Sequence, residues 1–311
     1  MSFNPEKVKG TVTKSTGSWH DVLAEGKKYE CRIRGKLRLE DSKETNPVAV
    51  GDWVEFEMEE GSHAITKILS RKNHLLRQSV KKTGHSNILA ANIDQAVLVA
   101  TLRQPRTSLG FVDRFLISAE AFRIPQLIVF NKMDLMNEEE IGLLKSLTKL
   151  YEAIGVSVIS LSALQGEGIE KLKSHLAGKI SLVAGHSGVG KSTLLNRLSS
   201  SITQTTGKIS GYSEKGTHTT TFAEMFSIDE KTSVIDTPGI KEWGLVDMVP
   251  QEISDYFPEM RELRLQCKFG SKCLHLHEPS CAVRVAVENN SIAVSRFESY
   301  VSMAEGKDNR K

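Results

Sequence analysis

The sequence has few cysteines, few aromatic residues and no long apolar run. It contains four cysteines in 311 residues, and aromatic residues make up 6%. Such a low cysteine count excludes a disulfide-rich secreted scaffold. No stretch approaches the roughly 18 apolar residues of a membrane helix, and the opening MSFNPEKVKG lacks the apolar segment of a secretory signal. We therefore expect a cytoplasmic protein that has no membrane partner. We also expect it to be a monomer.

Acidic residues are missing from residues 61–93, although the net charge of the chain is only +3. The cations of this segment are Lys67, Arg71, Lys72, Arg77, Lys81 and Lys82. A second basic stretch, 27–38, carries Lys27, Lys28, Arg32, Arg34, Lys36 and Arg38 against the single acid Glu30. Clustered cations are typical of surfaces that bind a nucleic acid backbone, and a solvated basic face is the alternative.

Apolar and turn patterns predict three domains, at residues 1–80, 81–248 and 249–311. Short alternating strands at 9–15, 28–39, 50–59 and 64–70 predict a small β-barrel, with Gly51 and Asp52 marking a turn. A segment of this size suits an OB-fold, which often binds nucleic acid. A purely structural barrel is the alternative.

From residue 92, strands alternate with helices, which predicts an α/β domain with a parallel sheet. The expected strands are 94–102, 126–130, 156–160, 179–184 and 232–236. Two amphipathic patterns predict helices: Phe111, Phe115, Ala119 and Phe122 recur at helical spacing, and Leu143, Leu147, Leu150 and Ile154 define one face of residues 138–154. After residue 245 the alternation stops, and a further helical pattern covers 282–304 through Val283, Val287, Ile292 and Val294.

The segment GHSGVGKS, residues 185–192, matches the phosphate-binding loop G-x-x-x-x-G-K-[ST]. It stands between an expected strand and a helical pattern, as this loop requires. Backbone N–H groups cradle the phosphates, Lys191 reaches the β- and γ-oxygens, and Ser192 binds Mg²⁺. The residues expected around the phosphates are Gly185, His186, Ser187, Gly188, Val189, Gly190, Lys191, Ser192 and Thr193.

A second phosphate motif, DTPG, ends the expected strand 232–236. Asp236 is placed to hold the water shell of Mg²⁺, and the Gly239 N–H faces the γ-phosphate. The polar segment 207–221 lies between the two motifs and fits a switch region in which a threonine hydroxyl contacts Mg²⁺. We assign that role to Thr220; Thr219 and Thr221 stay open, and a plain flexible loop is the alternative.

The segment NKMD, residues 131–134, follows the buried strand 126–130 and predicts a guanine site. The Asp134 carboxylate accepts hydrogen bonds from guanine, and because adenine lacks that donor pair, this residue argues against an ATPase. Asn131 braces the site, the Lys132 stem covers the ring beside Met133, and Ser162 and Ala163 of the SAL segment offer backbone N–H groups to the guanine oxygen. These motifs precede the phosphate loop, whereas most GTPases have the reverse order, so the domain is predicted to be circularly permuted.

Three of the four cysteines fall close together near the C-terminus. Cys267, Cys273, His275 and Cys281 form a three-thiolate, one-imidazole set that suits a closed structural zinc site, with His277 as a competing ligand. The energy of binding zinc is large enough to fold a small domain. We expect one structural Zn²⁺ per chain.

The combination of an N-terminal barrel, GHSGVGKS, HTTT, DTPG and the C-x-H-x-x-E-P-x-C segment 273–281 resembles the RsgA (YjeQ) family of bacterial GTPases. The resemblance covers nearly the whole chain. It implies GTP hydrolysis with Mg²⁺, a checkpoint or release role in late maturation of the small ribosomal subunit, stimulation by that subunit, and contacts of the barrel and zinc domain with its rRNA. The family pattern favours His275 over His277. One departure is that five residues separate Cys267 from Cys273, where the family pattern has four.

The group that orients the attacking water is not obvious in this sequence. Ras-like enzymes have a glutamine directly after the glycine of the second phosphate motif, and here that position is Ile240. We therefore predict slow hydrolysis of GTP to GDP without a partner. His218, or a group supplied by the partner, is expected to orient the water, and the expected catalytic set is His218, Lys191 and Thr220.

Overall fold

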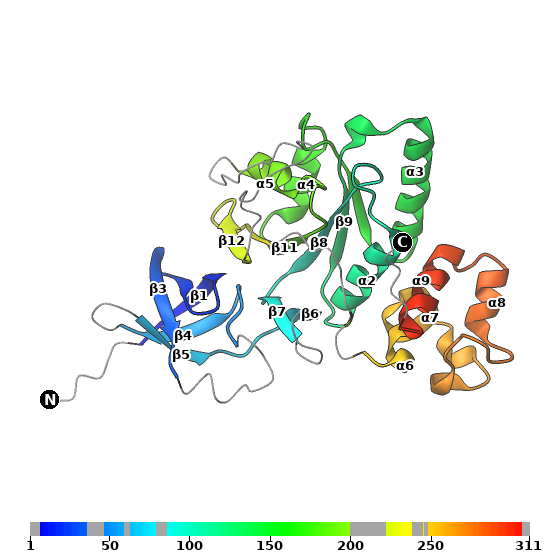
Figure 1. The fold of residues 1–311 in the computed structure, drawn as a ribbon, viewed down its shortest axis with the longest axis horizontal. Helices are drawn as coiled ribbons and strands as arrows, with labels where there is room; N and C mark the ends of the chain where they lie inside the picture. The colour runs from blue at the N-terminus through cyan, green and yellow to red at the C-terminus, as the bar shows by residue number, and fades with distance from the viewer. Residues whose placement is uncertain are drawn as a thin grey trace, which may run out of the picture.

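The computed structural model describes residues 7–35, 47–58, 63–78, 86–199, 222–237, 245 and 248–306. Three parts follow one another across the molecule, with a β-barrel on one side of a central α/β domain and a small helical domain on the other (Figure 1). The three-part architecture predicted from the sequence is therefore confirmed.

The N-terminal part is a closed five-stranded barrel. Its strands are β1 (Lys7–Ser15), β2 (His20–Ala24), β3 (Lys27–Ile33), β4 (Trp53–Glu57) and β5 (His63–Ile68). The barrel closes because β1 pairs with both β2 and β4, while β5 pairs with β3 and β4. Alternate side chains, among them Val12, Val22 and Phe56, fill its interior. The OB-fold prediction is confirmed, although β2 was not predicted.

A hairpin of β6 (His74–Gln78) and β7 (Ser86–Ala91) forms a separate two-stranded sheet between the barrel and the central domain (Figure 1). Leu75, Leu89 and Ala90 pack into the core of the central domain. The hairpin therefore crosses the expected boundary at residue 80, and its apolar side chains belong with the second domain.

The central sheet has the strand order β10-β9-β8-β11-β13-β12. Its strands are β8 (Gln95–Ala100), β9 (Gln126–Phe130), β10 (Ser157–Ser160), β11 (Ile180–Ala184), β12 (Glu224–Ser227) and β13 (Ser233–Asp236). The first five strands of the order run parallel, and β12 is antiparallel to β13. At its far edge, β12 also pairs with β1 of the barrel through Glu224 and Lys14.

Helices cover both faces of this sheet. One face carries α2 (Leu109–Glu120) and α3 (Glu138–Ala153), and the other carries α4 (Ile169–Leu176) and α5 (Lys191–Leu198). A short 3-10 turn, η1 (Met133–Leu135), follows β9. The predicted apolar face of 138–153 is shifted by one residue, because Leu144, Leu147 and Tyr151 are buried while Leu143 is 40% exposed.

The C-terminal domain consists of short helices and 3-10 turns around its own apolar cluster. They are α6 (Pro250–Ile253), η2 (Ser254–Tyr256), α7 (Pro258–Arg261), η3 (Arg264–Gln266), η4 (Gly270–Lys272), α8 (Ala282–Glu288) and α9 (Val294–Ala304). The helical pattern predicted for 282–304 corresponds to two helices, with a break between them. Asn290 adopts a left-handed φ of 62° after α8 and ends it, and Val294 is 51% exposed at the start of α9.

Among the described residues, the structure contains no helix with the length and apolar character needed to cross a membrane.

Candidate nucleotide site and metal centre

The phosphate-binding loop connects β11 to α5, as its motif predicts. Parallel strands place the loop at the carboxyl edge of the sheet, and α5 begins at Lys191, so its free N–H groups face the loop. Gly190 has φ +91°, and a Cβ at this position would lie 2.4 Å from Asn131 Nδ2. Only glycine fits there, because the loop packs directly against the expected guanine site.

Two buried charges meet beside this loop. Lys191 is 9% exposed and Asp236, at the end of β13, is 1% exposed. The Lys191 Nζ lies 3.7 Å from Asp236 Oδ1. A buried carboxylate next to a phosphate-binding lysine suits a site that takes up Mg²⁺ with a triphosphate. Ser192, the second residue of α5, lies at the same edge of the sheet.

Asn131 joins three segments of the site. It is 2% exposed, its Nδ2 donates to the Val189 carbonyl at 2.8 Å, and its Oδ1 accepts from the Ala163 N–H at 2.9 Å. The Ser162 hydroxyl donates to the Asp134 carboxylate. The structure therefore brings the NKMD, SAL and phosphate-loop segments together, and the hydrogen bonds of Asn131 connect them.

Lys132 connects the same loop to the segment before α2. Its ammonium donates to the Gly188 carbonyl at 2.7 Å and also to the Gln104 carbonyl. Burial lowers the pKa of Lys132, and the nearby Asp134 opposes this shift. Met133 begins η1, and its N–H donates to the Leu161 carbonyl at 3.2 Å. These contacts hold the loop and the guanine motif in one unit.

Three expected site residues lie outside the described part of the chain. They are His218, Thr220 and Gly239, and the same is true of Thr219, Thr221 and Ile240. Their predicted roles stay predictions.

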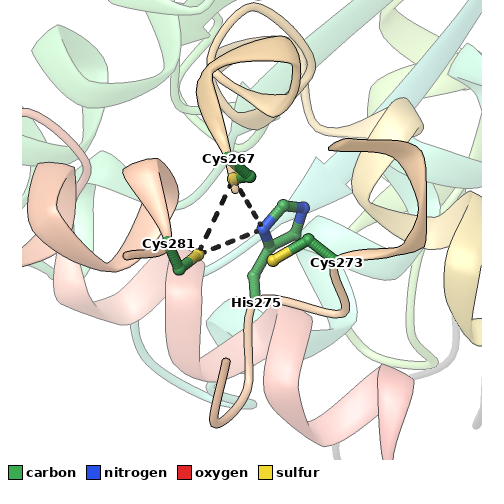
Figure 2. Close-up of side chains that lie close together, drawn as sticks. All are labelled: Cys267, Cys273, His275 and Cys281. Carbon is green, nitrogen blue, oxygen red and sulfur yellow. Dashed lines mark hydrogen bonds between the residues drawn. The ribbon is translucent and has the colours of Figure 1, made fainter. Parts of the chain in front are cut away.

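The three C-terminal cysteines and His275 meet in one buried cluster (Figure 2). Their ligand atoms all lie within 4.8 Å of one another. Cys267 Sγ lies 3.9 Å from Cys281 Sγ, while His275 Nδ1 lies 3.6 Å from Cys267 Sγ and 3.3 Å from Cys281 Sγ. His277, the competing candidate, is exposed, so the geometry favours His275.

This cluster fits a tetrahedral zinc ion. Sulfur atoms about 2.3 Å from an ion at the centre of a tetrahedron lie about 3.8 Å apart, close to the observed separation. Burial raises the pKa of Cys273 to about 12 and also raises the pKa of Cys281, so binding of a metal by these two residues requires the loss of their protons. Burial lowers the pKa of His275, which keeps its imidazole neutral and able to bind a metal.

Glu278 organises the loop that carries His275. Its carboxylate accepts hydrogen bonds from the N–H groups of Leu274, Leu276 and His277, at 2.7 to 3.1 Å. Burial opposes ionisation of Glu278, but these donors outweigh it and lower its pKa. The loop holds His275 at φ 57°, a conformation that needs such support. The 3-10 turn η4 takes up the longer interval between Cys267 and Cys273.

Two residues that shape these sites were assigned no role from the sequence. Glu278 is the glutamate of the C-x-H-x-x-E-P-x-C segment, but the motif alone does not show that its carboxylate organises the loop. Arg197 on α5 donates to the Ala163 carbonyl at 3.2 Å and to the Leu164 carbonyl at 2.8 Å. These two hydrogen bonds hold the backbone of the SAL segment in place. No local pattern marks Arg197, because its role depends on a neighbour more than 30 residues away in the chain.

The chain matches two family models along most of its length. Residues 9–66 match the RsgA N-terminal domain, and residues 68–246 match the RsgA GTPase. The junction lies before the β6–β7 hairpin, in line with the packing of Leu75 into the central domain.

Curated relatives match from end to end. The small ribosomal subunit biogenesis GTPase RsgA 2 of Bacteroides thetaiotaomicron is 49% identical, and the alignment covers 98% of each chain. The small ribosomal subunit biogenesis GTPase RsgA of Christiangramia forsetii is 47% identical, with 97% of each chain covered.

Solved structures agree with this assignment. YjeQ from Thermotoga maritima superposes with a TM-score of 0.75 at 37% identity, covering 98% of this chain and all of that one. YloQ, described as a circularly permuted GTPase, gives a TM-score of 0.72 at 29% identity, covering all of this chain and 98% of that one. The chain therefore belongs to the RsgA family of circularly permuted GTPases and is an enzyme that hydrolyses GTP.

Proposed function

We propose that the chain is a GTP-dependent checkpoint and release factor in late maturation of the small ribosomal subunit, working in the cytoplasm as a monomer. One observation carries the proposal: relatives that align over the whole chain, including both outer domains, are named for biogenesis of that subunit. In this proposal, the two outer domains bind the ribosomal subunit. Hydrolysis of GTP in the central domain determines when the protein is released.

Selection of GTP rests on Asp134 in this proposal. Its carboxylate, held by the Ser162 hydroxyl, accepts hydrogen bonds from the guanine edge, while Asn131 keeps the SAL segment beside it. Lys191 and the N–H groups at the start of α5 bind the phosphates. Mg²⁺, when bound with GTP, neutralises charge on the phosphates, and Ser192, Asp236 and Thr220 are the residues that would hold it.

Hydrolysis would be slow without a partner because Ile240 stands where Ras-like enzymes have their water-orienting glutamine. We assign this orienting role to His218. Replacement of His218 by alanine is expected to remove most of the hydrolysis stimulated by small subunits while GTP still binds. Stimulated turnover at the wild-type rate in that variant would refute the assignment.

Binding to rRNA would use the basic face of the barrel. The Arg32 guanidinium lies over the Trp19 ring, 3.8 Å from its centroid, and Trp53 is 39% exposed. A cation stacked on an aromatic ring can contact both phosphates and bases. Not every cation of the basic stretches is available to bind RNA, because Arg34 pairs with Glu57 and Arg71 pairs with Asp52.

The C-terminal domain would supply a second rRNA-binding surface. Structural zinc, held by Cys267, Cys273, His275 and Cys281, would keep that surface folded.

Cosedimentation with purified small subunits tests the proposal directly. Wild-type protein with a non-hydrolysable GTP analogue should pellet with the subunits, and the GDP form should stay in the supernatant. Arg32→Ala should weaken pelleting and flatten its salt dependence, whereas Lys145→Ala on α3 should not. Equal pelleting of the GTP and GDP forms would reject the release model. Failure to bind subunits in either state would favour a switch that acts on a non-ribosomal partner.

A further inference from the structure

Helix α2 touches the phosphate-binding loop at its N-terminal end. The ring of Phe111, in the first turn of α2, stacks on the ring of His186, with centroids 3.9 Å apart and an interplanar angle of 35°. Phe111 is 6% exposed and belongs to the core of the central domain. His186 therefore rests on a side chain that α2 places in the core of the central domain.

The segment before α2 contacts the same loop. Lys132 joins the carbonyls of Gln104 and Gly188, and Pro105 lies 3.4 Å from where a Gly188 Cβ would stand. The Thr101 N–H donates to the Thr107 hydroxyl at 3.1 Å, which closes this segment on itself. The phosphate loop is thus supported along one side by residues 101–111.

The opposite face of α2 belongs to the interface with the C-terminal domain. Residues two apart on a helix point in different directions, whereas residues four apart share a face. Phe111 and Phe115 face the central core, while Asp113 and Ile117 face the C-terminal domain. Glu120, three residues further on, continues this second face and pairs with Arg261 at 2.9 Å.

A buried ion pair lies at the centre of that interface. Arg296 of α9 is 1% exposed, and its guanidinium donates to Asp113 at 2.6 Å and to Glu259 at 2.7 Å. The Tyr151 hydroxyl of α3 donates to the same Asp113 oxygen at 3.1 Å. Removing Arg296 would leave the buried Asp113 carboxylate without its cation, so this pair favours one docked arrangement of the two domains.

We propose that Phe111, Asp113 and Arg296 are positioning residues for the phosphate-binding loop, so that docking of the C-terminal domain onto α2 and binding of nucleotide beside His186 strengthen each other. Asp113 lies only two residues from Phe111, so a shift of α2 at the ion pair moves the ring under His186. Coupling of this kind is reciprocal: docking raises nucleotide affinity by the same factor by which nucleotide favours docking.

The first test concerns the ring contact. Phe111→Leu removes the stack but keeps an apolar side chain, and Phe115→Leu makes the same change one turn along α2 in the same core. Aromatic contacts of this strength predict nucleotide binding about three- to tenfold weaker in Phe111→Leu, measured with a fluorescent GTP analogue. Phe115→Leu should stay within about twofold of wild type. Equal loss in both variants would show that only core packing matters.

The second test acts from the other domain. Arg296→Lys keeps the charge but not the forked geometry, and Arg261→Lys makes the same change at the exposed pair with Glu120. Arg296→Lys should weaken GTP binding about threefold, while Arg261→Lys should not change it. The double variant with Phe111→Leu should bind no more weakly than Phe111→Leu alone, because both act on His186. Unchanged affinity in Arg296→Lys, together with a lower melting temperature, would reduce the ion pair to a structural role.

Hydrogen exchange tests the reciprocal effect in the unmodified protein. A non-hydrolysable GTP analogue should slow amide exchange in α9, residues 294–304, and Phe111→Leu at saturating nucleotide should abolish that slowing. If the amide exchange rates of α9 in wild-type protein are the same with and without nucleotide, the proposal is overturned, whatever the results for the substituted proteins.

Discussion

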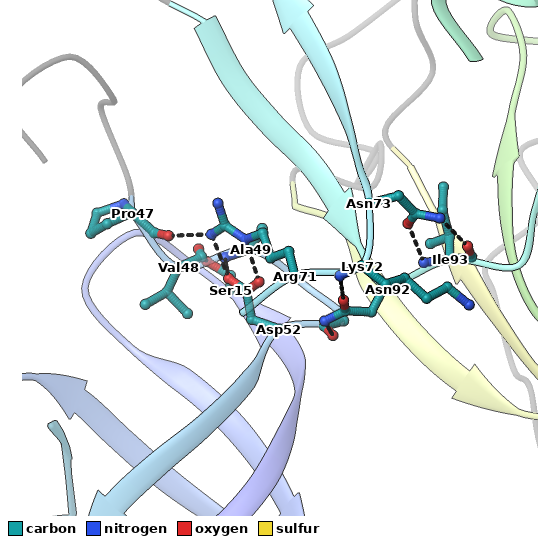
Figure 3. Close-up of polar contacts among 11 residues, drawn as sticks. Ser15, Pro47, Val48, Ala49, Asp52, Arg71, Lys72, Asn73, Asn92 and Ile93 are labelled. Atoms are coloured by element: carbon teal, nitrogen blue, oxygen red, sulfur yellow. Dashed lines mark hydrogen bonds and ion pairs between the residues drawn. The ribbon is translucent and has the colours of Figure 1, made fainter. Parts of the chain in front are cut away.

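The two outer domains are attached to the nucleotide-binding domain in different ways. The barrel is joined through a polar network, in which Asp52, Arg71, Asn73 and Asn92 hydrogen-bond across the connecting chain (Figure 3). The C-terminal domain is joined through apolar packing that includes Ile117 of α2, with one buried ion pair at its centre. The first junction depends on directional hydrogen bonds, whereas the second depends on apolar packing around an ion pair.

The two domains also differ in what keeps each of them folded. The barrel closes its own ladder of backbone hydrogen bonds around a core that includes Val12, Val54 and Phe56. The C-terminal domain has helices of 4 to 11 residues, and helices shorter than about 12 residues are marginal alone. We therefore expect this domain to depend on its cysteine cluster and its dock on α2, and the barrel to depend mainly on its own strand pairing and core.

Loss of the proposed zinc site should have the largest effect of any change considered. In zinc-finger peptides, structural zinc contributes about 10–16 kcal/mol of apparent binding energy. Cys281→Ser, or treatment with a strong chelator, should unfold the C-terminal domain and make the amides of α8 and α9 exchange rapidly. The amides of β2 and β3 should keep their protection, because the barrel does not share this cluster.

Cys31 of the barrel provides a matched control. It is a buried free cysteine on β3, and burial raises its pKa to about 12, so it is an unreactive core residue. Cys31→Ser should cost about 1 kcal/mol and leave α8 and α9 protected. Similar losses from Cys281→Ser and Cys31→Ser would mean that the C-terminal cluster is an ordinary buried core.

The next largest effect should come from Asp52 at the barrel junction. Asp52 is fully buried, and its carboxylate accepts two hydrogen bonds from Arg71 and one from the Ala49 N–H. Asp52→Ala removes the carboxylate that pairs with Arg71, which keeps its hydrogen bond to the Pro47 carbonyl, and takes the acceptor from the buried Ala49 N–H. Breaking this pair should cost about 3–5 kcal/mol of unfolding free energy. Urea unfolding followed by barrel tryptophan fluorescence measures it. Asp21→Ala, which breaks the exposed pair with Lys28, should stay within about 0.5 kcal/mol of wild type.

A smaller effect is expected where the barrel meets the central sheet. Lys14 of β1 pairs with Glu224 of β12 at 2.9 Å, and both side chains are partly exposed. Such a pair contributes about 0.2–1 kcal/mol, so Lys14→Ala should raise exchange in β12 only modestly. A double-mutant cycle with Glu224→Ala isolates the pair. A coupling energy of several kcal/mol would mean that this ion pair attaches the barrel to the central sheet as strongly as the buried ion pair attaches the C-terminal domain.

Local patterns predicted what depends on local sequence. The strand predicted at 126–130 matches β9 residue for residue, because four consecutive apolar residues, all buried in the structure, stand directly before NKMD. The helix predicted at 138–154 corresponds to α3 at 138–153. Its apolar face was placed wrongly, because Leu143 and Leu144 both fit the apolar period and only packing against the sheet selects Leu144. Strand β2 was missed because its five residues include His20 and Asp21, which weaken the apolar signal.

Contacts between distant segments could not be predicted from the sequence. The motifs indicated a guanine and phosphate site, yet nothing local shows that Asn131 bonds to Val189 and Ala163 or that Arg197 supports the SAL segment. The Asp113–Arg296 pair joins residues 183 positions apart. In both cases, the sequence gives the residue types, and only the fold decides which of them meet.

The smallest expected effect is a pH dependence at the barrel junction. His74 of β6 packs against Phe122, with ring centroids 4.5 Å apart. Burial lowers the pKa of His74, the nearby Arg71 lowers it further, and Asp52 opposes them. The folded protein therefore binds this proton less readily than the unfolded chain. The stabilisation is complete above the unfolded pKa of about 6.5 and is lost as the pH falls toward the folded value.

His74→Phe keeps a ring against Phe122 and removes the titration. Urea unfolding at intervals between about pH 7.5 and 5.5 should show wild type losing stability faster than His74→Phe as the pH falls. The same comparison in the Asp52→Ala background should give a larger difference, because removing the carboxylate leaves Arg71 to oppose the protonated imidazole alone. Parallel curves for wild type and His74→Phe would show that the polar junction does not include His74 and ends at Asn73.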